Sequence, residues 1–555
     1  MSENEKHFRQ NETDGEEDNE VISDVVYDDT AFQKANEEMN IAFSDEKGIE
    51  NWEKLAQEEK SSKSPIRKLF TAQIPLNFKN KKYMVYTLGV FSAFAGLLSG
   101  VDQSIISGAT IGMEDALNLT SLQQSLVSSL MPLGAMAGSL MMSPLNEFIG
   151  RRLSIIVSCL WYTLGAAICA GSMSHQMMYA GRFLLGIGVG IEGGCVGIYI
   201  AESVPASVRG NIVSLYQFNI ALGEVVGYAI AAIFFEVEGG WRFMVGSSLV
   251  FSTILLLGML CLPESPRYLA HKGRIGEAFD VWKQLRDLDD PSSQLEFLEM
   301  KNTSQEENER VKQENTVSLL LDIVKIKRNR RALIYSVIMV GLGQLTGVNS
   351  IMYYMSSLMK QIGFNEKKSV FMSLVGGGSL LIGTIPAILW MDRFGRRVWG
   401  MNLVGFFIGL VFVAAGYLVN IKTQLAEAEG LYFTGIILYE LFFGSYSCLT
   451  WVLPSESFSL QTRSIGMTIS STFLYLWTFI VTYNFNKMKE AMTYPGLMLG
   501  FYGGIAFVGF FYQIFFMPET KDKTLEEIDS IFSKSSFTIA KENYNHMKAF
   551  WKFRS

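Results

Sequence analysis

The sequence predicts an all-α membrane protein with twelve transmembrane helices in two halves of six. Three observations favour this fold class: an apolar composition, twelve apolar segments of membrane-spanning length, and charged motifs that recur in both halves. Of the 555 residues, 49% are hydrophobic and 18% are charged, whereas an average soluble domain has about 25% charged residues. The composition therefore favours a chain that lies mostly in a lipid bilayer.

The first 82 residues precede the apolar part of the chain. Residues 1–60 hold 19 Asp or Glu against 6 Lys or Arg, and residues 61–82 hold six basic residues and no acid. A segment with this many charges and no long apolar run cannot bury enough apolar surface to fold alone. We therefore expect an acidic and mostly disordered N-terminal tail over residues 1–82.

Twelve segments are long enough to cross the bilayer as helices, which takes about 20 mostly apolar residues. They lie at residues 84–108, 123–145, 153–172, 177–201, 212–234, 242–262, 332–357, 369–391, 398–419, 430–454, 465–487 and 496–517. The alternating pattern of a membrane β-barrel is absent from the sequence. The predicted domains after the tail are a six-helix half at 83–262, a polar central loop with short helices at 263–331, a second six-helix half at 332–517, and a C-terminal tail at 518–555.

Basic residues in the short loops predict the orientation of the chain, because Lys and Arg concentrate on the cytoplasmic side. The loops on the side of the tail carry Arg151, Arg152, Arg209, Arg393, Arg396, Arg397 and Arg463. The opposite loops at 109–121, 173–176 and 235–240 carry neither Lys nor Arg. Both termini and the central loop are therefore expected in the cytoplasm.

Three charged motifs occur once in each half, at matching span boundaries. The pairs are NEFIGRR (146–152) with MDRFGRR (391–397), AESVPASVRG (201–210) with SESFSLQTRS (455–464), and PESPR (263–267) with PETKD (518–522). Because acids and arginines recur together at one face, we expect them to pair and to hold that face shut. The residues of this predicted charge network are Glu147, Arg151, Glu202, Arg209, Asp392, Arg396, Glu456 and Arg463.

The chain resembles the sugar porters of the major facilitator superfamily, including fungal hexose, polyol and inositol transporters, over about residues 84–530. The segments that carry the resemblance, besides the repeated motifs, are GRFLLGIGVG (181–190), PESPRYLAHKG (263–273), GQLTGVNSIMYY (343–354) and PETKDKTLEEID (518–529). The resemblance implies a secondary transporter that moves a sugar or polyol by alternating access of the two halves. It implies no enzyme activity, cofactor, metal or nucleic-acid partner.

Asp102 is an acid within the first predicted span. An ionised Asp at mid-helix costs about 2.5–3.5 kcal/mol on insertion scales, so it should face the interior and be paired, with Arg182 as the expected partner. The resemblance implies that this pair couples proton uptake to transport. Facilitative relatives also carry the matching Asp, so an uncoupled porter remains an alternative. A transporter-like nutrient sensor is an alternative from another class.

Amide side chains suit a sugar because they both donate and accept hydrogen bonds. The resemblance implies a substrate site formed by Gln217, Glu224, Gln344, Asn349, Tyr353, Trp451 and Tyr475. Several positions depart from the family pattern: Gly343, Glu224 and Leu474 stand where the family has Gln, and Tyr475 stands where it has Trp. We therefore do not expect an ordinary glucose site.

Glu192 and Glu440 are two further acids within predicted spans, without counterparts in the family pattern. They could bind protons or help to recognise a polyol or a cationic group, or they could only form hydrogen bonds between helices. The plasma membrane is the expected location, with a vacuolar or other internal membrane as the alternative. We expect the protein to work as a monomer in the bilayer.

Overall fold

The computed structural model describes residues 46–61, 73, 81–288, 290–311, 316–458, 462–521, 523 and 525–552. Over these residues the chain forms helices and no strand. Eleven helical runs among the described residues are long and apolar enough to cross a membrane. The last run, Arg463–Phe516, has 54 residues and contains the eleventh and twelfth predicted spans. Its backbone breaks at Thr493, with φ 62° and ψ 162°, so the run supplies two spans.

The first six spans form one body, which we call the N-terminal bundle. Its helices are α4 (Lys81–Leu117), α5 (Ser121–Phe148), α6 (Arg151–Ala170), α7 (His175–Ser203), α8 (Ala206–Phe234), α9 (Gly240–Gly246) and α10 (Ser248–Cys261). Helix α4 packs along α8, and α5 and α6 pack along α7. Small residues allow this close approach: a Cβ on Gly190 would lie 2.0 Å from the carbonyl oxygen of Ala135.

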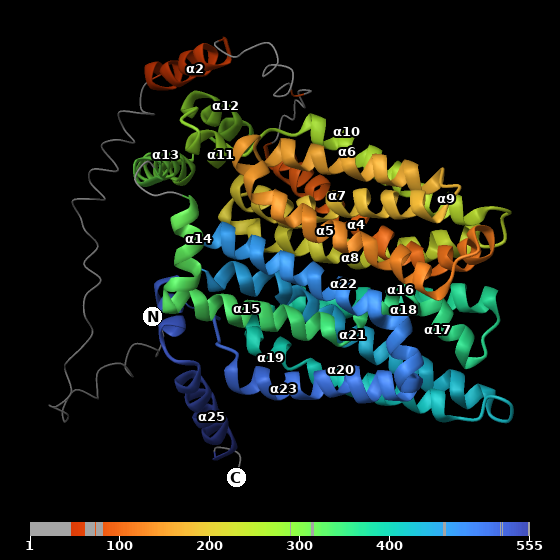
Figure 1. The fold of residues 1–555 in the computed structure, drawn as a ribbon. Coiled ribbons are helices and arrows are strands. Elements are labelled where there is room, and N and C mark those ends of the chain that lie inside the picture. The colour runs from red at the N-terminus through yellow and green to blue at the C-terminus, as the bar shows by residue number, and fades with distance from the viewer. Residues whose placement is uncertain are drawn as a thin grey trace, which may run out of the picture.

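The last six spans form the C-terminal bundle, which lies beside the first (Figure 1). Its elements are α15 (Lys327–Leu345), α16 (Val348–Tyr353), α17 (Met355–Ile362), α18 (Glu366–Phe394), α19 (Arg396–Gly400), α20 (Leu403–Leu418), α21 (Leu425–Ser457), α22 (Arg463–Pro495), the π-helical η1 (Gly496–Gly503) and α23 (Gly504–Phe516). Across the interface between the bundles, α5 packs against α22 and α8 against α18. Any site between these helices is therefore built from both bundles.

Several shorter helices gather at one end of the two bundles (Figure 1). They are α11 (Pro266–His271), α12 (Ile275–Leu285), α13 (Pro291–Val311) and α14 (Thr316–Lys325) of the central segment, α24 (Leu525–Ser533) and α25 (Ser536–Lys552) after the last span, and α2 (Glu46–Ser61). Helix α2 falls inside the tail for which the sequence indicated disorder. Most of the rest of that tail lies outside the described residues.

The turns at this end of the bundles need glycine. Gly150, after α5, has φ 97°, and Gly395, after α18, has φ 84°. These positive values strain residues that carry a Cβ. A Cβ would also lie 2.5 Å from a carboxylate oxygen of Glu264 at the first turn and 2.7 Å from one of Glu519 at the second. The two turns therefore bring a carboxylate against the start of the next helix, in both bundles.

Candidate functional site

A cavity of about 740 Å³, counted with its opening, lies between the two bundles. Helices α4, α5, α7 and α8 line it from one side, and α15, α16, α18, α21 and α22 from the other. All seven residues of the predicted substrate site line this cavity: Gln217, Glu224, Gln344, Asn349, Tyr353, Trp451 and Tyr475. Polar lining residues outside this predicted set are Ser99, Gln103, Ser447, Thr450 and Thr478.

Gln217, Ser447 and Trp451 form what we call the bridging trio. The Gln217 amide nitrogen donates to Ser447 Oγ at 3.0 Å, and its oxygen accepts from Trp451 Nε1 at 3.1 Å. Gln217 belongs to α8, whereas the other two belong to α21, so this amide joins the two bundles. The Trp451 ring also meets the ring of Tyr216 edge-on, with centroids 5.9 Å apart.

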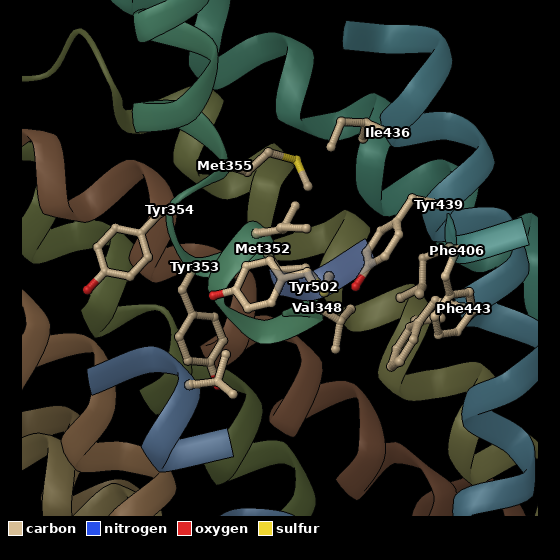
Figure 2. Packing of buried hydrophobic residues seen from close by; sticks show 14 of the residues in the cluster. Val348, Met352, Tyr353, Tyr354, Met355, Phe406, Ile436, Tyr439, Phe443 and Tyr502 are labelled. Atoms are coloured by element: carbon tan, nitrogen blue, oxygen red, sulfur yellow. The ribbon is translucent and has the colours of Figure 1, made fainter. Parts of the chain in front are cut away.

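Gln344, Asn349 and Thr478 form a second polar group on the wall of the C-terminal bundle. Asn349 donates to Gln344 Oε1, and Thr478 Oγ1 donates to the same oxygen at 3.2 Å. The break between α15 and α16 makes this possible. It falls at Gly347, whose φ is 91° and where a Cβ would lie 2.5 Å from the Tyr502 ring. Tyr502 lies beside α16 among other buried aromatic side chains (Figure 2).

Tyr353, Tyr475 and Glu224 complete the predicted site. The Tyr353 hydroxyl contacts the sulfur of Met131, on the other bundle, at 3.9 Å. The Tyr475 hydroxyl reaches across to α7, where a Cβ on Gly193 would lie 2.7 Å from it. Glu224 is 3% exposed, and its Oε2 has no hydrogen-bond partner among the described residues. The cavity thus contains a carboxylate that can still accept hydrogen bonds.

Asp102 and Arg182 are both buried, but the structure does not join them directly as the sequence led us to expect. Ser248 Oγ donates to Asp102 Oδ1 at 2.5 Å, and Arg182 Nε donates to the Val127 carbonyl oxygen at 3.2 Å. The ion pairs between described residues do not include this pair. The expectation of a direct contact is therefore wrong for this arrangement, because a serine and a backbone carbonyl bind the two groups instead. The two charges remain within electrostatic reach of each other.

Four residues of the predicted charge network form two ion pairs at the end of the bundles that carries the central segment. Arg151 pairs with Glu202 at 2.8 Å, and Arg396 pairs with Glu456 at 2.8 Å. Glu147 pairs with Lys272 just after α11. The remaining members are Arg463, which begins α22, and Arg209 and Asp392, whose side chains lie outside the described residues.

Glu264 and Glu519 are members of this network that the prediction did not include, although the PESPR and PETKD repeat contains both. Glu264 Oε1 accepts from the backbone N–H groups of Arg151 and Arg152, each at 3.0 Å. Glu519 accepts from those of Arg396 and Arg397 at 2.9 and 3.1 Å. Burial raises the pKa of the Glu264 carboxyl, and the backbone N–H groups of Arg152 and Ser265 oppose that shift. Each carboxylate caps the helix that follows the glycine turn.

Glu192 and Glu440 are fully buried and lie outside the cavity lining. Neither carboxylate has a hydrogen-bond partner among the described residues. Neither residue therefore lies where it would contact a substrate in this cavity. Proton binding by either residue stays a prediction.

Comparisons with known proteins agree with the geometry of the site. The family model described as sugar (and other) transporter matches residues 77–532. The chain is 55% identical to the Myo-inositol transporter FST1 of Gibberella moniliformis over 85% of its length and 83% of the relative's. It is 31% identical to the Arabinose-proton symporter of Escherichia coli K12, over 83% of this chain and 96% of that one. It is 27% identical to the human Proton myo-inositol cotransporter, over 81% of this chain and 82% of that one.

Solved structures show the same fold. The proton:xylose symporter XylE bound to 6-bromo-6-deoxy-D-glucose aligns with a TM-score of 0.69 at 22% identity, over 82% of this chain and all of that one. Its inward-open form, from E. coli, aligns with a TM-score of 0.66 at 21% identity, over 80% of this chain and 99% of that one. The described helices therefore adopt the major facilitator fold.

Proposed function

Because the chain belongs to the sugar transporter family, we propose that it is a proton-coupled transporter of a polyol, specifically a cyclitol such as myo-inositol. The polar cavity between the bundles is the observation that carries this proposal, since all seven predicted substrate residues line it. The 55% identity to a protein named as a myo-inositol transporter supports the choice of a cyclitol.

The chemistry of Glu224 favours a cyclitol over a pyranose sugar. A pyranose ring includes an oxygen that only accepts hydrogen bonds, whereas myo-inositol carries a hydroxyl on every ring carbon. A carboxylate also only accepts, so Glu224 suits an additional hydroxyl and repels a ring oxygen. Gln217, Gln344 and Asn349 supply amides that both donate and accept, and the Trp451 ring offers an apolar face to the C–H groups of the substrate.

Contacts between the bundles on both sides of the cavity provide a basis for alternating access. On the side of the α4–α5 turn, Asn486 of α22 donates to Ser125 Oγ of α5 at 3.0 Å. On the side of the central segment, Ser139 of α5 and Thr472 of α22 share a hydrogen bond at 3.0 Å. Transport requires each set to break in turn while the other holds the bundles together.

Asp102 is the proposed proton carrier. It lies beside Ser248, and its Oδ2 has no hydrogen-bond partner among the described residues, so that oxygen can take up a proton. We further propose that the end carrying the central segment faces the cytoplasm, as the basic loops indicate. We also propose that the protein acts as a monomer in the plasma membrane.

Uptake by the purified full chain in proteoliposomes tests this function. We expect myo-inositol to accumulate against its gradient when the lumen is alkaline, and hexoses and pentoses to compete weakly. Asp102→Asn should equilibrate myo-inositol without accumulating it, whereas Asp115→Asn, at the exposed end of the same helix, should behave as wild type. Uptake that ignores the proton gradient would favour a facilitative porter. Absence of any uptake would favour a sensor.

A further inference from the structure

Helix α2 presents one face to the central segment. Trp52, Ala56 and Glu59 lie on this face, at the i, i+4, i+7 spacing of a helix. Helix α2 packs against α12, beside the end of the bundles (Figure 1). Ala56 is fully buried, and a Cβ on Gly276 would lie 2.5 Å from the Ala56 nitrogen. The two helix backbones therefore touch at the start of α12.

Glu59 caps the first turn of α12. Its carboxylate accepts from the backbone N–H of Gly276 at 3.2 Å and from that of Glu277 at 2.9 Å. The first N–H groups of a helix lack partners within the helix, and the positive end of the helix dipole attracts an anion. Residues more than 200 positions apart in the sequence are thus joined by two specific hydrogen bonds.

Trp52 joins α12 to α13. Its ring centroid lies 6.1 Å from that of Phe279 on α12 and 5.7 Å, edge-on, from that of Phe297 on α13. The Lys301 ammonium of α13 lies 5.4 Å from the Trp52 centroid. Both phenylalanines are fully buried. The aromatic ring of α2 therefore closes the small core between the two central helices.

The two central helices have different connections to the bundles. Arg286, after α12, donates to the Ser203 carbonyl at the end of α7 at 3.0 Å, which fixes α12 to the N-terminal bundle. Helix α13 continues through α14 into α15, the first helix of the C-terminal bundle. Arg286 also pairs with Glu296 of α13 at 2.9 Å. Helix α2 therefore adds a second restraint on α13, through Trp52, to the one that this ion pair provides.

We propose that α2 is a docking helix that acts as a brake on transport. The α12–α13 surface is its binding site, and the occupant is this segment of the chain's own N-terminal tail. While α2 is seated, the linker between the bundles is restrained and the bundles exchange slowly between their two arrangements. When α2 is released, α13 loses its contact with Trp52, the restraint on the linker is weaker, and exchange is faster. The brake rests on the proposed transport function, whereas docking itself does not.

Docking is tested by cross-linking in the full chain. Glu53 Oε1 lies 3.0 Å from Lys283 Nζ on α12, so Glu53→Cys with Lys283→Cys should be joined by a short bismaleimide. Lys54→Cys with Lys283→Cys is the control, because Lys54 lies on the face of α2 opposite Trp52 and Ala56. Trp52→Ala should reduce the first cross-link. No difference between the two pairs would overturn the docking.

The brake is tested by uptake rates in proteoliposomes. Trp52→Ala and Glu59→Ala should raise the maximum rate about fivefold, at the lower end of the usual range of coupling between linked sites. They should leave KM unchanged because α2 is not part of the cavity, and Gln57→Ala should match wild type. Cross-linking α2 to α12 should slow uptake. A maximum rate that stays the same or falls in Trp52→Ala, with the cross-link lost, would overturn the brake. A wild-type chain that takes up nothing refutes the proposed function instead, and the cross-link still reports docking.

Discussion

Replacing the cavity carboxylate by an amide, Glu224→Gln, should shift the substrate preference of the protein. A hydrogen bond to a charged group contributes about 1.5–3 kcal/mol and a neutral one about 0.5–1.5 kcal/mol. The substitution keeps the shape of the side chain, so the loss is the difference, about 1–1.5 kcal/mol. Since 1.4 kcal/mol is about tenfold in affinity, KM for myo-inositol should rise about five- to tenfold. Glucose, whose ring oxygen can accept from the new amide, should compete better.

The measurement is the initial rate of labelled myo-inositol uptake into proteoliposomes, with and without glucose. Asp115→Asn is the control, because Asp115 is exposed at the end of α4 and outside the cavity lining. Its KM should equal that of wild type. The reasoning is refuted if Glu224→Gln leaves KM and glucose competition unchanged, or if Asp115→Asn alters KM as strongly.

Three further variants test other contacts. Trp451→Phe keeps a ring in the cavity but loses the bond to Gln217. A substrate hydroxyl then no longer has to displace that bond, so at about 0.5–1.5 kcal/mol per bond the uptake KM should fall about two- to tenfold. An unchanged KM would contradict the bridging trio. Gly347→Ala should lower the Tm of the purified protein, because φ 91° strains alanine and its Cβ would meet the Tyr502 ring. Glu519→Gln should also lower Tm, by weakening the cap on the first turn of α19. An unchanged Tm would refute the structural role of either residue.

Much of the fold was predictable because a bilayer imposes length and composition on each span. The predicted family and fold class are confirmed by the family model and the solved structures. The cavity residues were predicted from motif positions, and the structure brings all seven together. Their roles remain predictions. The sequence did not predict Ser447 or Thr478 as site residues, because hydroxyl side chains are common in membrane helices. Only the structure shows that they bond the amides of Gln217 and Gln344.

The neighbours of Asp102 and α2 were not predictable in the same way. The pairing of Asp102 with Arg182 assumed that opposite charges in a membrane meet directly. In the structure, Ser248, 146 positions away, donates a hydrogen bond to Asp102 Oδ1 instead. A serine at that distance carries no signal in a single sequence. Helix α2 is too polar to fold alone. It is stabilised by Phe279 and Phe297, which lie more than 200 positions away and so outside any sequence pattern of the tail.

The bridging trio suggests how binding and motion are linked. Before a substrate arrives, the amide of Gln217 bonds Ser447 and Trp451 of the other bundle. A substrate hydroxyl that takes over either bond exchanges one hydrogen bond for another, so the net gain in affinity is small. The exchange also replaces a direct tie between the bundles with one through the substrate. A ligand shifts an equilibrium only through such differential contacts. A polyol that bonds both bundles therefore keeps them tied while they move, whereas a ligand that bonds Gln217 alone breaks the tie without replacing it.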